Sequence, residues 1–200
     1  MDFRRLLPIV FSALLLTAAP VSADDPADGA LPGETGGRDD RALPPAPASP
    51  PHLARVAPVE LKIPRLGVDA DVEPVGADPD GAMSAPSDPD AVAWWSLGWG
   101  TGEPGNVVLA GHVDWGGRLR VFGALRLLEA GDQVVVVDER AREYFYQVVW
   151  SRQVEAEGAD VDSIFGPDNP PELTLITCGG SFDQSQRMYL DRIVVRARLV

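Results

Sequence analysis

Short apolar runs, each ended by glycine, proline or charged residues, fill the chain from Val59 to Val200. Apolar residues alternate at Val68, Ala70 and Val72. Runs of about four to eight residues bounded in this way are typical of strands rather than of long helices. Many short strands with few short helices predict an all-β fold, either a closed barrel or a sandwich.

The boundaries of these runs predict the individual strands. Two strands flank the Pro-Arg-Leu-Gly turn at 64–67, and a hairpin joins Gln133–Val137 to Tyr144–Trp150 around a charged turn. The run "ELTLITC" reads as a core strand that ends at Cys178. The two glycines that follow it are expected to let the chain turn away and leave the thiol open.

Two short helices are also expected. One is a turn or two within 87–98, which opens with a Ser-Asp-Pro start signal. The other lies within 120–132, where Phe122, Leu125 and Leu128 are spaced as on an amphipathic helix that a glycine ends.

The N-terminal part of the chain has the pattern of an export signal. Two arginines precede a short apolar run, and Val21-Ser22-Ala23 supplies small residues before a cleavage site. The run is shorter than the ~20 residues that span a bilayer comfortably. We predict a cleaved signal peptide at 1–23, with an uncleaved membrane anchor as the alternative. A disordered Pro/Gly-rich linker at 24–58 and one folded domain at 59–200 then follow, outside the cytoplasm.

Composition excludes several classes of function. The net charge of −13 argues against nucleic acid, which binds clustered lysine and arginine. One cysteine and two dispersed histidines cannot build a standard zinc site, and the acidic residues lack calcium-loop spacing. No nucleotide-binding glycine motif stands out. We therefore expect neither a metal nor a cofactor.

Cys178 is the only cysteine, so it cannot form a disulfide within the chain. An unpaired thiol in an exported protein is a liability unless it is buried or used. Free cysteine is among the most buried residue types, so packing alone would explain it. The count of cysteines leaves both readings open.

A nucleophilic cysteine needs a base and a donor for the charge that forms on the substrate oxygen. His52 lies in the predicted linker, whereas His112 follows an apolar strand, where a sheet can position it. Arg187 and Arg192 follow Cys178 by nine and fourteen residues. On one strand these two arginines would point to opposite faces, so at most one of them faces the thiol.

The segment "TLITC", Thr174 to Cys178, resembles the T-L-x-T-C signature of the sortases, which are cysteine transpeptidases of Gram-positive envelopes. The segments "IPRLGVDADVEPVG", "GEPGNVVLAGHVDW", "LITCGGSFD" and "YLDRIVV" are similar to class F sortases of actinobacteria. The resemblance covers Val59 to Val200.

This resemblance implies an eight-stranded sortase-type barrel with a Cys-His-Arg site. It implies that Cys178 is the nucleophile and His112 the general acid/base. Arg187 is the preferred arginine for its short spacing, with Arg192 as the alternative. Thr177 either touches substrate or faces the core.

The resemblance also implies the substrates: secreted proteins with a Leu-Pro-x-Thr-Gly-like motif, cleaved between Thr and Gly, and an amine acceptor on the cell wall or another protein. The enzyme would act at the Gram-positive cell envelope, secreted or held by its N-terminal segment. Two alternatives stay open: an envelope cysteine hydrolase, and a non-catalytic binding domain in which Cys178 is merely packed.

Overall fold

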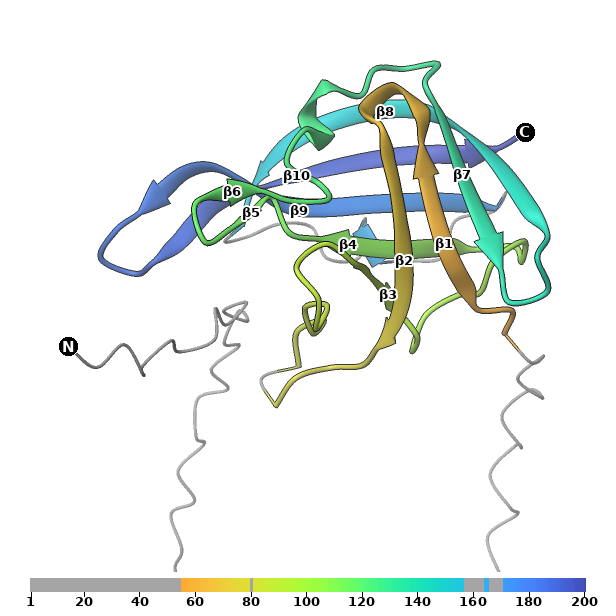
Figure 1. The fold of residues 1–200 in the computed structure, drawn as a ribbon, viewed down its shortest axis with the longest axis horizontal. Helices are drawn as coiled ribbons and strands as arrows, with labels where there is room; N and C mark the ends of the chain where they lie inside the picture. Colours follow the sequence, from red (N-terminus) through yellow and green to blue (C-terminus); the bar gives the residue numbers. More distant parts are fainter. Residues whose placement is uncertain (1–54, 80, 157–163, 166–170) are drawn as a thin grey trace, which may run out of the picture. The chain divides into compact units, whose positions relative to one another are not determined.

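The strands close into a barrel in the computed structural model of the chain (Figure 1). The structure describes residues 55–79, 81–156, 164–165 and 171–200. Eight strands follow one another around the barrel in the order β1-β2-β3-β4-β9-β10-β8-β7, and β5 pairs with β6 in a separate small sheet. The all-β prediction is confirmed, and the fold is the closed barrel, which leaves no unpaired sheet edge, rather than the sandwich.

The elements have the following bounds. The strands are β1 Pro58–Ile63, β2 Val68–Val75, β3 Val92–Trp95, β4 Asn106–Gly111, β5 Asp114–Trp115, β6 Arg118–Leu119, β7 Gln133–Asp138, β8 Glu143–Glu155, β9 Glu172–Asp183 and β10 Met188–Leu199. Two 3₁₀ turns are η1 Pro64–Leu66 and η2 Leu125–Leu127. In the described barrel, β2–β3 and β4–β9 pair in parallel and the other neighbours pair antiparallel.

Each strand places alternate side chains inside the barrel. Leu173 and Leu175 of β9 and Leu109 of β4 are fully buried in the main core, beside Phe122 and Tyr146. The residues between them on β4 and β9 therefore lie on the outer face of the sheet. This alternation puts Cys178 on the outer face, because it is separated from Leu175 by an odd number of positions.

The helix expected within 87–98 is wrong, because this segment contains strand β3. Ser87 does not cap a helix: its backbone N–H and hydroxyl both donate to the Glu73 carboxylate. The Asp88 carboxylate accepts from the Asp90 N–H at 2.9 Å, which closes a local turn. The polar residues that resembled a helix start therefore form a turn. The apolar residues that follow them form β3, which pairs with β2 on one side and with β4 on the other.

The helix expected within 120–132 is only the 3₁₀ turn η2 in the structure. Phe122, Leu125 and Leu128 are buried together, as their spacing predicted. Their interval of three residues fits the three residues per turn of a 3₁₀ helix better than the α-helical period. The chain leaves this segment through Gly131, which has a φ of 97°.

Two strands are longer than the sequence predicted. The hairpin strand β8 runs on to Glu155, and β9 continues past Cys178 to Asp183. The far ends of β9 and β10 form a hairpin that projects beyond the barrel (Figure 1). Cys178 consequently lies within a strand and not at its end.

The predicted leader, and the linker as far as residue 54, lie outside the described residues. Residues 55–58, expected to finish the linker, already belong to the fold, since Thr101 N–H donates to the Val56 carbonyl at 2.8 Å. Within the described residues, no helical segment has the length and hydropathy needed to cross a membrane.

The β7–β8 turn is built around a buried carboxylate. Asp138 is 0% exposed, and it accepts hydrogen bonds from the backbone N–H groups of Arg140 and Arg142. The Tyr144 hydroxyl and the Arg142 guanidinium also donate to it. Burial alone would raise the pKa of Asp138, but these donors outweigh burial and hold the pKa below its ordinary value.

We predict that Asp138→Asn lowers the free energy of unfolding at pH 7 by about 2–3 kcal/mol, because the carboxamide cannot accept all these bonds. A lowered folded-state pKa contributes stability that is present above the unfolded pKa and lost as pH falls through the folded value. The difference from wild type should therefore shrink below about pH 4. Urea unfolding at several pH values measures it, and a difference that stays constant down to low pH would contradict the prediction.

Candidate active site

The parallel pairing of β4 with β9 brings His112 beside Cys178. Ala110 of β4 is the register partner of Ile176 of β9. Two positions further on stand His112, just past the end of β4, and Cys178, within β9. The Thr177 hydroxyl donates to the Gly111 carbonyl at 2.7 Å, which holds the two strands together immediately before the pair. Residues 66 positions apart in the chain are thereby brought together at the end of β4.

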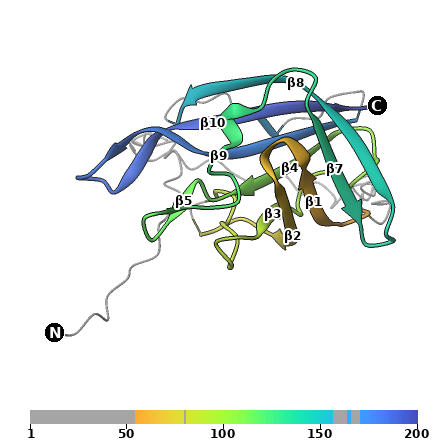
Figure 2. The ribbon, with the colours of Figure 1, turned by 45° about the horizontal axis from the view of Figure 1, so that its top comes forward.

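On the other side of Cys178 lies Arg192. The antiparallel pairing of β9 with β10 makes Cys178 and Arg192 direct register partners. Side chains of directly opposed residues stand on the same face of a sheet. Strand β9, which carries Cys178, lies between β4 and β10 in the barrel (Figure 2). The register therefore puts Arg192 opposite Cys178 on one side and His112, just past the end of β4, on the other.

Arg187, the arginine preferred from the sequence, lies elsewhere. It is exposed in the turn between β9 and β10, with a φ of 55°, before β10 begins at Met188. The backbone therefore assigns Arg187 to the turn and Arg192 to the strand beside the thiol. The spacing in the sequence could not decide between the two arginines, because the choice depends on where strand β10 begins.

Thr177 faces inward and is 2% exposed. Its hydroxyl is engaged with the Gly111 carbonyl. Of the two alternatives for Thr177, the structure has the side chain in the interior, where it joins the strands that carry Cys178 and His112.

The glycines after Cys178 do not turn the chain away, contrary to expectation. They lie at a β-bulge, because the β9–β10 register shifts between Tyr189 and Asp191. Gly180 has a φ of 73°, and a Cβ built on it would lie 1.9 Å from Asp191 Oδ2. Glycine is required there both for the left-handed backbone and for the close approach of Asp191. The bulge bends the projecting hairpin without ending the strand.

Carbonyl groups around the bulge hold the guanidinium of Arg192. Its Nη1 donates to the Tyr189 carbonyl at 3.1 Å and to the Asp191 carbonyl at 2.9 Å. The Tyr189 hydroxyl in turn donates to Asp114 Oδ2 at 3.1 Å. Sequence reasoning missed Tyr189 and Asp114, since neither belongs to a local motif that indicates the contact.

The environment favours the neutral forms of both the thiol and the imidazole. Burial raises the pKa of Cys178, and the Asp114 charge adds to this, while Arg192 opposes it. Burial lowers the pKa of His112, with Arg120 acting in the same direction; a hydrogen bond with the Pro86 backbone and the Asp114 charge oppose it. The His112 ring also packs on Trp115, with 5.0 Å between ring centroids.

An aliphatic strip lies on the same outer face as the thiol. Met83, Ala93, Val108 and Ala110 are buried there, and Ile176, Trp95 and Phe165 pack against them. Phe165 meets Trp95 edge-on, with centroids 5.9 Å apart. The strip runs along β4 and β9 toward their N-terminal ends, away from Cys178.

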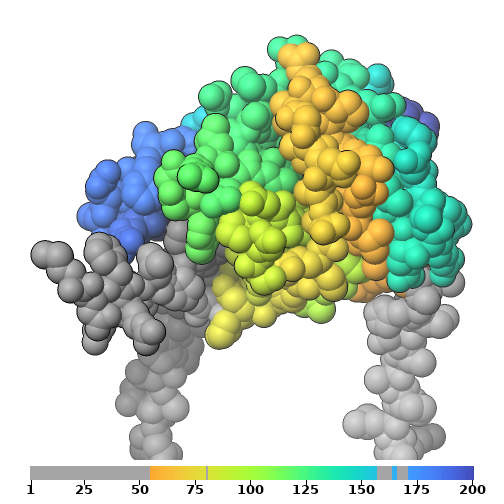
Figure 3. Space-filling view, in the orientation of Figure 1, coloured from red at the N-terminus to blue at the C-terminus, as the bar shows by residue number. Residues whose placement is uncertain are grey.

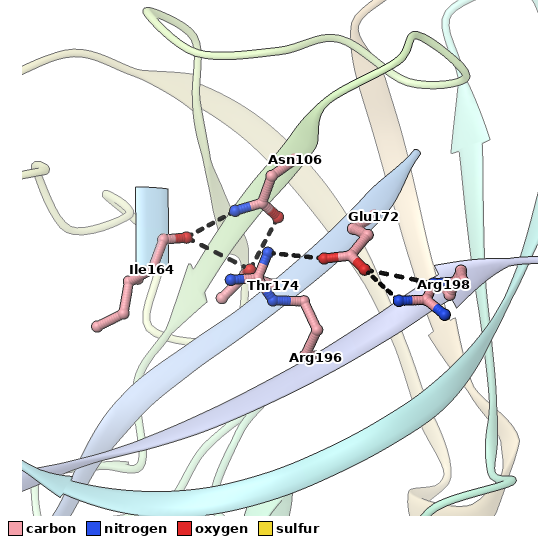
Figure 4. Close-up of polar contacts among 6 residues, drawn as sticks. All are labelled: Asn106, Ile164, Glu172, Thr174, Arg196 and Arg198. Carbon is pink, nitrogen blue, oxygen red and sulfur yellow. Dashed lines mark hydrogen bonds and ion pairs between the residues drawn. The ribbon is translucent and has the colours of Figure 1, made fainter. Parts of the chain in front are cut away.

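A polar network lies near the N-terminal ends of β4 and β9 (Figure 4). The buried Asn106 side chain donates to the Ile164 carbonyl at 2.6 Å and accepts from the Thr174 hydroxyl at 2.8 Å. Beside it, Glu172 is paired with the guanidinium groups of Arg196 and Arg198. These bonds fasten the Ile164–Phe165 turn to the sheet.

A thiol between an imidazole and a guanidinium is an arrangement suited to acyl transfer, because it offers a nucleophile, a base and a donor to an oxyanion. The family comparison points to the same chemistry. A family model described as the sortase domain matches residues 61–200. The chain belongs to the sortase family, whose members are cysteine transpeptidases.

Solved sortase structures share the fold. A sortase D5 transpeptidase of Clostridium perfringens is 19% identical with a TM-score of 0.53, over 72% of this chain and 79% of that chain. The lid mutant of sortase A from Corynebacterium diphtheriae is 19% identical with a TM-score of 0.55, over 76% and 74%. The SrtA sortase of Actinomyces oris is 23% identical with a TM-score of 0.54, over 72% and 79%. No curated protein matches the sequence.

We predict that alkylation of Cys178 by iodoacetamide has a pH midpoint above the ~8.5 of a free cysteine, because burial disfavours the thiolate. Arg192→Ala should raise the midpoint further, since the Arg192 charge lowers the pKa of the thiol. Mass spectrometry of samples quenched along a pH series measures the rate, and the single cysteine makes the signal specific. Arg187→Ala is the matched control and should leave the midpoint unchanged; equal effects of the two variants would contradict this electrostatic assignment.

Proposed function

We propose that this sortase cleaves a Leu-Pro-x-Thr-Gly-like motif between Thr and Gly and transfers the acyl group to an amine at the cell envelope. The observation that carries the proposal is the strand register that brings Cys178, His112 and Arg192 together. We also propose that it is a class F-like sortase. The similarity of the segments quoted above to class F sortases supports this subclass.

In this proposal Cys178 is the nucleophile and His112 the general acid/base. His112 takes the thiol proton as the sulfur attacks the threonine carbonyl carbon. The tetrahedral intermediate collapses when the C–N bond breaks, and the imidazolium gives its proton to the departing glycine amine. An acyl-thioester on Cys178 remains. The acceptor amine then attacks the thioester carbonyl, His112 takes the amine proton, and the thiolate leaves and is reprotonated.

We assign the oxyanion-stabilising role to Arg192 in place of Arg187. Arg192 shares the face and register position of the thiol, and two backbone carbonyls hold its guanidinium. A fixed positive donor beside the attacked carbonyl stabilises the charge that develops in the transition state. Arg187 instead lies in the turn between β9 and β10, before the strand that carries Arg192 begins.

The aliphatic strip is the surface that we propose for the Leu-Pro part of the motif. It starts next to Cys178 at Ile176 and includes Val108, Trp95 and Phe165. A peptide with its threonine carbonyl at the thiol and an extended backbone would place Leu and Pro roughly 7–10 Å away along the sheet. The strip offers apolar contacts over that length.

The predicted export signal at 1–23 and linker at 24–58 complete the proposal. They would deliver the domain across the membrane and leave it secreted, or held at the envelope by an uncleaved segment. Its partners there would be secreted proteins that carry the motif, and an amine on the cell wall or on another protein.

The decisive assay mixes the domain with a Leu-Pro-x-Thr-Gly peptide and a glycine-based amine. We predict a transfer product with wild type and none with Cys178→Ala, as judged by mass spectrometry. Product from hydrolysis alone would favour the cysteine hydrolase. No cleavage by wild type, or undiminished cleavage by Cys178→Ala, would overturn the proposal and leave the binding domain.

The same assay separates the arginines. Arg192→Ala should lower kcat by about 10²–10³-fold, as expected for loss of an oxyanion donor. Arg187→Ala should stay within about twofold of wild type, since substitution at an exposed turn has little effect. The reverse order would return the role to Arg187. Circular dichroism of both variants checks that the fold is intact.

A further inference from the structure

Tyr189 makes one hydrogen bond to the segment that follows His112 and another to Arg192. His112 and Arg192 are the candidate catalytic partners of Cys178. Through its hydroxyl Tyr189 donates to Asp114 Oδ2 at 3.1 Å, and Asp114 follows His112 by two residues. Through its carbonyl it accepts from Arg192 Nη1 at 3.1 Å. One residue therefore links the loop after His112 with the guanidinium beside the thiol.

The link joins two hairpins that are distant in the sequence. Asp114 begins β5, and Tyr189 lies near the start of β10, 75 residues later. The ribbon views show the β5–β6 hairpin beside the projecting ends of β9 and β10 (Figures 1 and 2). In the space-filling view their surfaces meet at one end of the molecule (Figure 3). The hydroxyl–carboxylate bond lies between these projecting parts.

Local contacts hold both partners in place. Tyr189 packs edge-on against Phe182, its cross-strand neighbour, with ring centroids 5.1 Å apart. On the other hairpin, the Arg120 N–H donates to the Val113 carbonyl at 3.1 Å and closes the loop that carries Asp114. Each side is thus ordered within itself, and the Tyr189 hydroxyl joins them.

We propose that Tyr189 and Asp114 are positioning residues that hold His112 and Arg192 on opposite sides of Cys178. The inference rests on the proposed function for its catalytic consequence. Neither residue needs to touch the substrate: the bond fixes the loop after His112 against the strand that carries Arg192. Without it, the two groups would no longer be fixed relative to each other, and a misplaced base lowers the rate steeply.

Charge gives the link a second consequence. The charged groups near His112 are Asp114 and Arg120, and those near the thiol are Arg192 and Asp114, with the Tyr189 hydroxyl beside them. The carboxylate favours the protonated forms of both the imidazole and the thiol. Its removal should move both pKa values down, which a purely structural contact would not do.

The experiment uses Tyr189→Phe, Asp114→Ala and the double variant in the full domain. Tyr189→Phe keeps the ring against Phe182 and removes only the hydroxyl. We expect each single variant to lower kcat for the Leu-Pro-x-Thr-Gly peptide about tenfold, with KM within about twofold. The double variant should fall no further than Asp114→Ala alone, because that change already removes the partner of the Tyr189 hydroxyl. If the losses of kcat in the two single variants multiply in the double variant, to about a hundredfold, the proposed coupling is overturned.

Two further measurements do not depend on the peptide. Hydrogen–deuterium exchange of residues 113–119 and 188–192 should rise together in Tyr189→Phe, and unchanged exchange in 113–119 would overturn the link. Asp114→Ala should lower the pH midpoint of Cys178 alkylation, and an unchanged midpoint would overturn the electrostatic part. If wild type cleaves no peptide, the proposed function fails while these two measurements still decide the link.

The chain provides its own matched control. Tyr144 donates to Asp138 at 3.0 Å in the β7–β8 turn, so Tyr144→Phe removes the same kind of bond outside the site. It should raise exchange around that turn and leave the alkylation midpoint and kcat at the wild-type values. An equal loss of kcat in Tyr144→Phe would show that the Tyr189 effect reflects general destabilisation.

Discussion

The site depends on the parallel pairing of β4 with β9. A parallel pair sets the two strands side by side in the same direction, so residues that follow matched positions emerge together at one end. Ala110 and Ile176 set the register, and the Thr177–Gly111 bond maintains it up to the positions before His112 and Cys178. A slip of one residue would put the thiol on the face that lines the core. The barrel therefore fixes through its register which residues stand beside Cys178.

The bulge after Cys178 fixes the third group. In a regular antiparallel ladder the carbonyls beside Arg192 would all point to neighbouring strands. At the bulge between Tyr189 and Asp191, the carbonyls of these two residues accept from the guanidinium. Gly180 makes the shift sterically possible, since any Cβ there would collide with Asp191. The glycines that looked like a strand end are what position the arginine.

Much of this fold could be predicted from the sequence, because the alternation of apolar residues and the residue preferences of turns are local properties. Three features could be recognised in the sequence: the alternation along β2, the β7–β8 hairpin, and the spacing of Phe122, Leu125 and Leu128. The helix within 87–98 failed because pairing with β2 and β4 overrides a local start signal. Cys178 and His112 were singled out by their chemical types, and their catalytic roles stay a prediction. Arg192 could not be preferred, because its place beside the thiol depends on where β10 begins.

The surroundings of the thiol suggest why a resting enzyme of this kind needs several positioning contacts. Burial raises the pKa of Cys178 and lowers that of His112, so it disfavours the charged forms of both groups. A site that must create its nucleophile at each turnover gains from groups already in place, since reorganisation then adds little to the barrier. Thr177, the Gly180 bulge and the Tyr189–Asp114 bond each constrain one neighbour of the thiol. In the proposed mechanism these polar contacts set the geometry of the site, and Arg192 supplies the positive charge.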